Sequence, residues 1–311
     1  MNKNLITIVI PTYNEEDNIL LIYDRINNIF KNKLLNYDYN LLFCDNKSID
    51  NTRKIIKDLS LNDSRIKYIF NLTNFGFSNS SFYGLTESRG DASILMYADM
   101  QDPPEVIPEF IKKWEEGNKV VIGIKSKSDE NALVYFVRSL YYYFIDNTSK
   151  INHISQYDGF GLYDNSVIRV LKSLDDKSPY LRGIIAELYN NAARVNYHQA
   201  KRNNGKSKFN FFGLYDLAML GITNYSTIPL RICVFFGALI ALCSFLIAIV
   251  TVILKLLNII TYPVGTAATL FGIFFLGGIQ LLFIGVLGEY VLRINTRTIG
   301  RPIVIEEERN F

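Results

Sequence analysis

Two long stretches without a charged side chain lie near the end of this chain, at residues 232–254 and 264–287. Each is long enough to cross the roughly 30 Å hydrocarbon core of a bilayer as a helix. A backbone in that core has to satisfy its hydrogen bonds internally, which helices do. The roughly 225 residues before them are enough for one globular head with its own core. We therefore predict a head followed by a two-helix transmembrane hairpin.

Basic residues flank this hairpin on both sides, whereas its connecting segment at 255–263 carries a single lysine. By the positive-inside rule, the head and both termini are expected in the cytoplasm. The predicted segments are a catalytic head at 1–200, a basic and amphipathic juxtamembrane segment at 201–228, the two helices within 229–290, and a cytoplasmic tail at 291–311.

Charge and composition exclude several classes of function. The net charge is only +3, so no strong positive field indicates binding to a nucleic acid. With only two histidines a histidine-rich metal site is excluded, and none of the three cysteines has a metal-ligand spacing. The remaining candidates for chemistry are carboxylates, amides and a few placed cations.

Apolar, β-branched runs alternate with amphipathic runs between residues 5 and 124. The runs predict strands at 5–10, 39–44, 66–70, 94–97 and 120–124, and helices at 15–30, 50–59, 78–88 and 104–116. This alternation predicts an α/β fold with a mostly parallel sheet, helices on both faces and right-handed crossovers.

Polar residues follow the predicted strands at the places where such a sheet binds ligands. Tyr13 and Glu15 follow the first strand, Asp45 the second, Asn74 the third and Asp99 the fourth. Ligands of open α/β sheets bind outside the carboxyl ends of the strands. Polar residues at the ends of four predicted strands therefore predict one ligand site.

Eight motifs in the chain resemble one known family. They are VIPTYNEEDNI at 9–19, CDNKSIDNT at 44–52, NFGFSNSSFYGL at 74–85, GDASILMYADMQDPPE at 90–105, DGFGLYDNSVI at 158–168, YLRGIIAEL at 180–188, RNNGKSKF at 202–209 and GEYVLRINTRTIGRP at 288–302. Together they resemble inverting nucleotide-sugar glycosyltransferases with the Rossmann-like GT-A fold. More narrowly, they are similar to the membrane-anchored polyprenyl-phosphate glycosyltransferases.

The resemblance implies transfer of a hexose-like sugar from a nucleotide-diphosphate sugar, with a UDP-sugar favoured, to a polyprenyl phosphate such as undecaprenyl phosphate. It implies a multi-pass protein of the bacterial inner membrane, whose partners are the nucleotide sugar, the lipid phosphate and the membrane. Glycines in the apolar stretches, such as Gly277 and Gly285, would permit close helix contact, so a homo-oligomer stays open.

The residues after the fourth strand suit a hard divalent cation that clamps a diphosphate. Asp99 and Gln101 can supply oxygen ligands to Mg²⁺ or Mn²⁺. The resemblance assigns catalytic roles to Asp158 and Asp102, and we expect Asp158 to orient the reactants. A phosphate acceptor is already largely anionic, so a strong base is not needed. A carboxylate such as Asp99 also suits a plain helix start.

The resemblance also implies two binding sets. The implied nucleotide-sugar-binding residues are Pro11, Tyr13, Glu15, Asp45, Asn74, Gly76 and Asp99. The implied acceptor-phosphate-binding residues are Arg138, Arg202, Lys206 and Lys208. Basic residues before a membrane span also attract anionic lipids in general, so a looser role for the two lysines stays open.

Three residues depart from the family pattern. Tyr97 stands where the family has the first Asp of Asp-x-Asp, and Asn46 and Lys47 stand where it has Asp and Gly. These departures admit an alternative, a nucleotide-sugar-binding membrane subunit with weak or no catalysis. A second alternative is a processive polysaccharide synthase, which two spans and the absence of a tryptophan-containing acceptor motif disfavour.

Overall fold

The computed structural model describes residues 3–127, 154–199, 228–257 and 266–311, together with the single residues 219, 223 and 226. Its strands lie in one eight-stranded sheet with the order β7-β5-β6-β4-β1-β2-β3-β8. The strands are β1 (Asn4–Thr12), β2 (Tyr37–Asp45), β3 (Ile66–Asn71), β4 (Ala92–Leu95), β5 (Val120–Lys127), β6 (Gly161–Asp164), β7 (Ala193–His198) and β8 (Glu306–Arg309). The helices of the head are α1 (Ile19–Lys33), α2 (Thr52–Asn62), α3 (Phe77–Glu87), the 3₁₀ turn η1 (Pro104–Val106), α4 (Ile107–Glu115), α6 (Asn165–Ser173) and α7 (Leu181–Leu188).

The centre of the sheet is parallel, as the alternation of strands and helices predicts. β1 pairs in parallel with both β2 and β4, and β2 pairs in parallel with β3. β5 and β7 form a further parallel pair, whereas β6 and β8 run antiparallel to their neighbours. The expectation of a mostly parallel α/β sheet is confirmed, and it brings the carboxyl ends of β1, β2, β3 and β4 to one edge.

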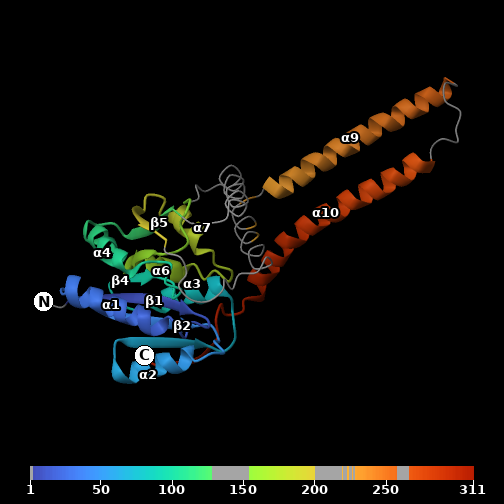
Figure 1. The fold of residues 1–311 in the computed structure, drawn as a ribbon. Helices are drawn as coiled ribbons and strands as arrows, with labels where there is room; N and C mark the ends of the chain where they lie inside the picture. The colour runs from blue at the N-terminus through green and yellow to red at the C-terminus, as the bar shows by residue number, and fades with distance from the viewer. Residues whose placement is uncertain are drawn as a thin grey trace.

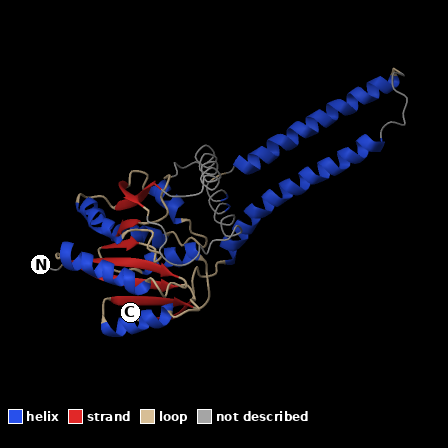
Figure 2. Cartoon of the chain, in the orientation of Figure 1, coloured by secondary structure: helices blue, strands red, loops and turns tan. Residues whose placement is uncertain are grey.

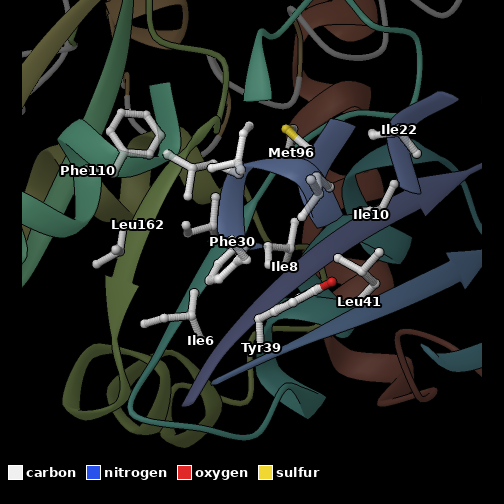
Figure 3. Packing of buried hydrophobic residues seen from close by; sticks show 14 of the residues in the cluster. Ile6, Ile8, Ile10, Ile22, Phe30, Tyr39, Leu41, Met96, Phe110 and Leu162 are labelled. Atoms are coloured by element: carbon white, nitrogen blue, oxygen red, sulfur yellow. The ribbon is translucent and has the colours of Figure 1, made fainter. Parts of the chain in front are cut away.

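Helices cover both faces of this sheet, so the head has three layers (Figure 2). On one face, α1, α2 and α4 pack on the inward side chains of β1 and β2. Figure 3 shows part of this core, where Ile6 and Ile8 of β1 lie beside Phe30 of α1 and Ile10 lies near Ile22. On the other face, α3, α6 and α7 form a second apolar cluster with the alternate side chains of the strands. Full burial of each such aliphatic side chain contributes about 1.5–3 kcal/mol, which makes the sheet a rigid support for the loops at its edge.

The C-terminal residues return to the head. We predict residues 291–311 to be a cytoplasmic tail; in the structure the second long helix continues to Ile299 and β8 pairs antiparallel with β3. Figure 1 places the C-terminus beside α2. β8 has the sequence EEER, without the apolar alternation that marks a half-buried strand, so local pattern does not reveal it.

Two long helices extend from the head side by side, α9 (Ile228–Leu256) and α10 (Thr266–Ile299) (Figure 1). Tyr290 of α10 donates a hydrogen bond to the carbonyl of Ser226 at 2.6 Å, next to the start of α9. Among the described residues, one helical segment is long and apolar enough to cross a membrane, at Phe275–Ile299, and Ile228–Ile240 is a shorter apolar helix. The structure thus contains a pair of helices where we predict the hairpin, and the candidate span lies within α10 and overlaps the predicted 264–287.

Candidate functional site

The end of β1 and the end of β2 enclose the carboxylate of Asp45. Thr12 pairs with Asp45 in the parallel register, so both strands leave the sheet at the same edge. Asp45 is fully buried. Its Oδ1 accepts hydrogen bonds from the Ser48 backbone N–H at 3.0 Å and from Arg53 Nε, and its Oδ2 accepts from Thr12 Oγ1 at 3.3 Å and from Ser48 Oγ. Four donors fill the acceptor sites of one carboxylate.

This enclosure bears on the predicted role of Asp45 as an acceptor for the nucleotide base. An N–H group of a base would have to displace one of the four donors that already hold the carboxylate. A buried carboxylate is tolerated only when it is paired and hydrogen-bonded, which Arg53 and Ser48 accomplish. The geometry therefore favours a role in holding the loop after β2, and a direct contact with the nucleotide stays a prediction.

Asn46 connects the loop after β2 with the loop after β3. Its Nδ2 donates to Asn74 Oδ1 at 2.8 Å, and its Oδ1 accepts from Asn71 Nδ2 at 3.1 Å and from the Phe75 N–H at 2.9 Å. Asn74 Oδ1 also accepts from the Gly76 N–H at 2.9 Å. The predicted nucleotide-binding residues Asn74 and Gly76 are thus fixed against the loop after β2.

Lys47 occupies the turn where the family pattern has glycine. Its φ of +66° shows that the tight turn is kept, in a left-handed conformation that costs a non-glycine residue about 1–2 kcal/mol. The side chain points its ammonium to Glu307 of β8, with Nζ and Oε2 2.8 Å apart. The charge of Lys47 is therefore paired with the C-terminal strand.

The loop after β1 is hydrogen-bonded to the start of α2. The Asn14 N–H donates to Ser48 Oγ, the Ile49 N–H donates to Asn14 Oδ1 and the Glu15 N–H donates to Thr52 Oγ1, each at 2.8 Å. Three loops therefore form one edge of the site. The predicted nucleotide-binding residues that this edge brings together are Pro11, Tyr13, Glu15, Asp45, Asn74 and Gly76.

A second group of polar residues follows β4, the other neighbour of β1. Asp99 Oδ1 accepts from the Gln101 N–H at 3.2 Å, and between them Met100 has a φ of +62°. Asp102 is buried, and its Oδ1 accepts from the Tyr197 hydroxyl at 2.8 Å. Within the described part of the chain, Oδ2 of Asp102 has no hydrogen-bond partner. A buried carboxylate oxygen without a partner is costly, and an ion, a water molecule or a catalytic role would account for it.

Asp158 approaches this group from the loop before β6. Its Oδ2 lies 2.7 Å from Nζ of Lys125 on β5, and both side chains are mostly buried, at 18% and 16% exposure. Burial and, secondarily, the charge of Asp158 raise the pKa of Asp102 well above its usual value, while Lys125 opposes the shift. Asp99, Asp102 and Asp158 thus share one electrostatic environment, and their catalytic and metal-binding roles stay predictions.

Tyr97 joins the two groups. Its ring lies 4.9 Å from the ring of Phe77, the first residue of α3, and its hydroxyl donates to the Asp158 carbonyl at 2.8 Å. A Cβ at Gly159, whose φ is +115°, would lie 2.7 Å from that hydroxyl. Burial raises the pKa of Tyr97, so its phenol stays neutral and does not replace the carboxylate of the family motif as an anionic ligand.

The donor set after β4 fits a hard cation that is shared with a substrate. The described residues contain no group of three or more His, Cys, Asp or Glu side chains arranged to hold a metal. Mg²⁺ is usually held by one or two carboxylates together with substrate phosphates, rather than by an all-protein cage. Asp99, Gln101 and the unpartnered oxygen of Asp102 offer such oxygen donors.

The predicted acceptor-phosphate residues lie outside the described residues, so their role stays a prediction. They are Arg138, Arg202, Lys206 and Lys208. Conversely, the structure adds side chains that sequence reasoning missed, namely Arg53, Lys125 and Tyr197. Each of the three contacts a carboxylate on another strand or loop, and none belongs to a sequence motif that would have identified it.

Comparisons with known proteins match nearly the whole chain. The family model described as glycosyl transferase family 2 matches residues 7–172, which include both groups of polar residues. The chain is 34% identical over 311 residues to the putative glycosyltransferase CsbB of Bacillus subtilis, covering 100% of this chain and 94% of that protein. It is 34% identical over 307 residues to the bactoprenol glucosyl transferase of Shigella phage SfV, covering 98% of this chain and 99% of that protein.

A solved structure supports the fold. The mannosyl-3-phosphoglycerate synthase from Rubrobacter xylanophilus superposes with a TM-score of 0.51 at 13% identity, over 70% of this chain and 72% of that chain. At this level of identity the likeness concerns the fold alone. It confirms the GT-A-like arrangement of the head.

Proposed function

This chain belongs to glycosyl transferase family 2, and on that premise we propose that it transfers a hexose-like sugar from a UDP-sugar to undecaprenyl phosphate. One observation carries the proposal. The loops after β1, β2 and β3, which we call the donor loops, and the acidic group of Asp99, Asp102 and Asp158 lie at one sheet edge. Tyr97 connects them, because its ring contacts Phe77 and its hydroxyl donates to the Asp158 carbonyl. The near full-length similarity to a bactoprenol glucosyl transferase supports the lipid acceptor.

In the proposed reaction, a phosphate oxygen of the lipid attacks the anomeric carbon of the sugar. The bond from that carbon to the diphosphate breaks on the opposite side, and the nucleoside diphosphate leaves with the electron pair. The configuration inverts. The acceptor oxygen is already anionic, so alignment and charge stabilisation contribute most of the catalysis.

Asp158 suits an orienting role in this reaction better than proton abstraction. Lys125 pairs with its Oδ2, and the Phe160 N–H donates to its Oδ1 at 3.2 Å. Both contacts stabilise the charged carboxylate and fix its direction. The free oxygen of Asp102 points to a second polar contact for the sugar or for a hydrated cation.

A divalent cation, Mg²⁺ or Mn²⁺, would be held by Asp99 and Gln101 together with the donor diphosphate. When bound, it would stabilise the charge that develops on the leaving diphosphate. Asp102 lies next to these residues, and Tyr97 occupies the position of a further carboxylate ligand. The substrate would therefore supply a substantial share of the oxygen ligands of the cation.

The pairing of β8 with β3 supports the predicted hairpin. β3 precedes both long helices and β8 follows them, yet the two strands are hydrogen-bonded in one sheet. The chain therefore crosses any membrane an even number of times between them. If the candidate span in α10 crosses, a second crossing is required between the two strands, and we propose α9 for it; the positive-inside rule then places the head and the C-terminus in the cytoplasm.

The test is incubation of the purified full-length protein with radiolabelled UDP-sugars, Mg²⁺ or Mn²⁺, and undecaprenyl phosphate. We expect a labelled lipid that requires both the cation and Asp99. Asp99→Asn should abolish the product, and Asn62→Asp, at an exposed position on α2, should leave it unchanged. Binding of a UDP-sugar without a lipid product would reject transfer and support the binding-subunit alternative.

A further inference from the structure

The C-terminal strand brings a carboxylate to the donor loops from the far end of the sequence. Glu307 of β8 lies 2.8 Å from Lys47 Nζ and 2.8 Å from Arg53 Nη1 through the same oxygen, Oε2. These are residues of the loop after β2 and of the first turn of α2. More than 250 residues separate Glu307 from each of them.

Arg53 uses every part of its guanidinium group in this region. Nε donates to Asp45, Nη1 donates to Glu307 and Nη2 donates to the Asn71 carbonyl at 2.6 Å. The group also lies over the ring of Phe70, 4.9 Å from its centroid. Arginine presents its donors in a rigid fork, so fixing one nitrogen fixes the others.

Two anions and two cations therefore form one neutral cluster, with Asp45 and Glu307 facing Arg53 and Lys47; we call it the donor-loop charge cluster. Asp45 is fully buried, so its charge depends on Arg53 being in place. Asp45, Lys47 and Arg53 belong to one continuous segment, residues 45–53, whereas Glu307 comes from β8. Without it, the cluster carries an uncompensated positive charge.

We propose that Glu307 is a positioning residue for the nucleoside diphosphate of the donor, because it holds Arg53 and Lys47 and thereby sets the shape of the loop after β2. The proposal rests on the proposed function only for the identity of the ligand. The donor site is then completed by β8, the strand that follows the long helices. The short segment 300–305 links α10 to β8.

A matched control lies next to Glu307 on the same strand. Glu308 pairs with Lys57 at 2.6 Å and accepts from the Tyr68 hydroxyl at 2.8 Å, without a contact to the donor-loop charge cluster. Its ion pair is as exposed as that of Glu307, at 46% and 41% against 42% and 40%. Glu307→Gln and Glu308→Gln therefore remove the same charge from the same strand.

The experiment uses the full-length protein in detergent and a panel of UDP, GDP, ADP, CDP and dTDP with Mg²⁺, of which the tightest binder is the probe. We expect Glu307→Gln to weaken binding of that probe about three- to fivefold, the range for one partly exposed ion pair. Glu308→Gln should leave it unchanged. Amide hydrogen exchange at residues 46–53 should become faster in Glu307→Gln and stay unchanged in Glu308→Gln. The decrease in Tm should be small and the same in both variants.

A stronger pair, Glu307→Lys and Glu308→Lys, repeats the comparison with a reversed charge. Equal nucleotide affinity in the position-307 and position-308 variants would overturn the proposal, as would a wild type that binds none of the five diphosphates. In the lipid assay, Glu307→Gln should raise KM for the donor with little change in kcat. A wild type that binds nucleotide but forms no lipid product rejects only the proposed acceptor chemistry, because the binding comparison stands by itself.

Discussion

At the scale of single residues, the site depends on amides and hydroxyls as much as on carboxylates. Asn46 stands where the family pattern has aspartate, and both ends of its amide are used, one as donor to Asn74 and one as acceptor from Asn71 and Phe75. Lys47 keeps the left-handed turn and finds a partner in Glu307. Both departures are accommodated by the surrounding contacts, so neither requires a loss of catalysis.

Restoring the family residue at position 46 is expected to harm this protein. In Asn46→Asp, two oxygens would face each other where Nδ2 now donates to Asn74 Oδ1, and Asn74 cannot turn its amide without losing Gly76. We expect a loss of about 1–3 kcal/mol in the free energy of unfolding, and weaker nucleotide binding. Chemical denaturation measures it, with Asn62→Asp as control. Unchanged stability would show that the Asn46 contacts are dispensable.

Tyr97 is expected to affect turnover more than donor binding. Tyr97→Phe removes the hydrogen bond to the Asp158 carbonyl but keeps the ring beside Phe77. The loss should be about 1 kcal/mol in stability, and the looser Asp158 loop should lower kcat while KM for the donor stays the same. Steady-state kinetics of lipid product formation check this. A rise in KM with unchanged kcat would place Tyr97 in donor binding instead.

At the scale of elements, β8 covers the outer side of β3, and polar contacts hold it there as well as apolar packing. Its three glutamates contact basic and tyrosine side chains of β3, α2 and α3, among them Lys57, Tyr68 and Tyr83. An edge strand with charged side chains also prevents further strands from adding to the sheet. The strand therefore serves both the stability of the head and the shape of the donor loops.

The docking of β8 should depend on pH in one direction. Hydrogen bonds from Lys47 and Arg53 hold the pKa of Glu307 at about 2, below the usual value of about 4.3. A carboxylate with a lowered pKa adds stability above its unfolded value, and that stability disappears as the pH falls through the folded value. The gap in Tm between wild type and Glu307→Gln should be constant from pH 8 to 5 and shrink below about pH 4. A gap that changes between pH 5 and 8 would contradict this origin.

At the scale of the whole molecule, one sheet contains strands from both ends of the chain, with two long helices between them. β3 and β8 can pair only if they lie on the same side of a membrane. The proposed donor site forms at that side, at the end of the head from which α10 extends (Figure 1). A water-soluble nucleotide sugar and a lipid phosphate can therefore meet at one surface.

This topology is expected to be visible by cysteine labelling in intact cells. In a variant without the three natural cysteines, single cysteines at Asn62 in the head and after Phe311 should resist an impermeant maleimide added outside. A cysteine at position 261, between α9 and α10, should react. Detergent, and not alkaline carbonate, should extract the protein from membranes. Labelling of the head and the C-terminus on opposite sides would contradict the pairing of β8 with β3.

Much of the head could be predicted from the sequence because its signals are local. The predicted strand at 39–44 lies within β2 (Tyr37–Asp45), and the predicted helix at 78–88 matches α3 (Phe77–Glu87) within one residue at each end. Alternation of apolar runs follows from burial on both faces of a parallel sheet, so it can be recognised without any contact being known. Strands β6, β7 and β8 escaped prediction because they lie beyond the alternation of apolar and amphipathic runs that ends at residue 124.

The sequence by itself determined the order of the parallel strands' loops, the acidic group after β4 and the two long apolar helices, since each depends on neighbouring residues along the chain. Only the tertiary structure decided that four donors enclose Asp45, that Asn46 joins two loops, and that Glu307 reaches Arg53 and Lys47. The reason is that charges and amides carry no periodic signal: a hydrogen bond between residues 53 and 307 exists only once β8 has paired with β3 at the edge of the sheet.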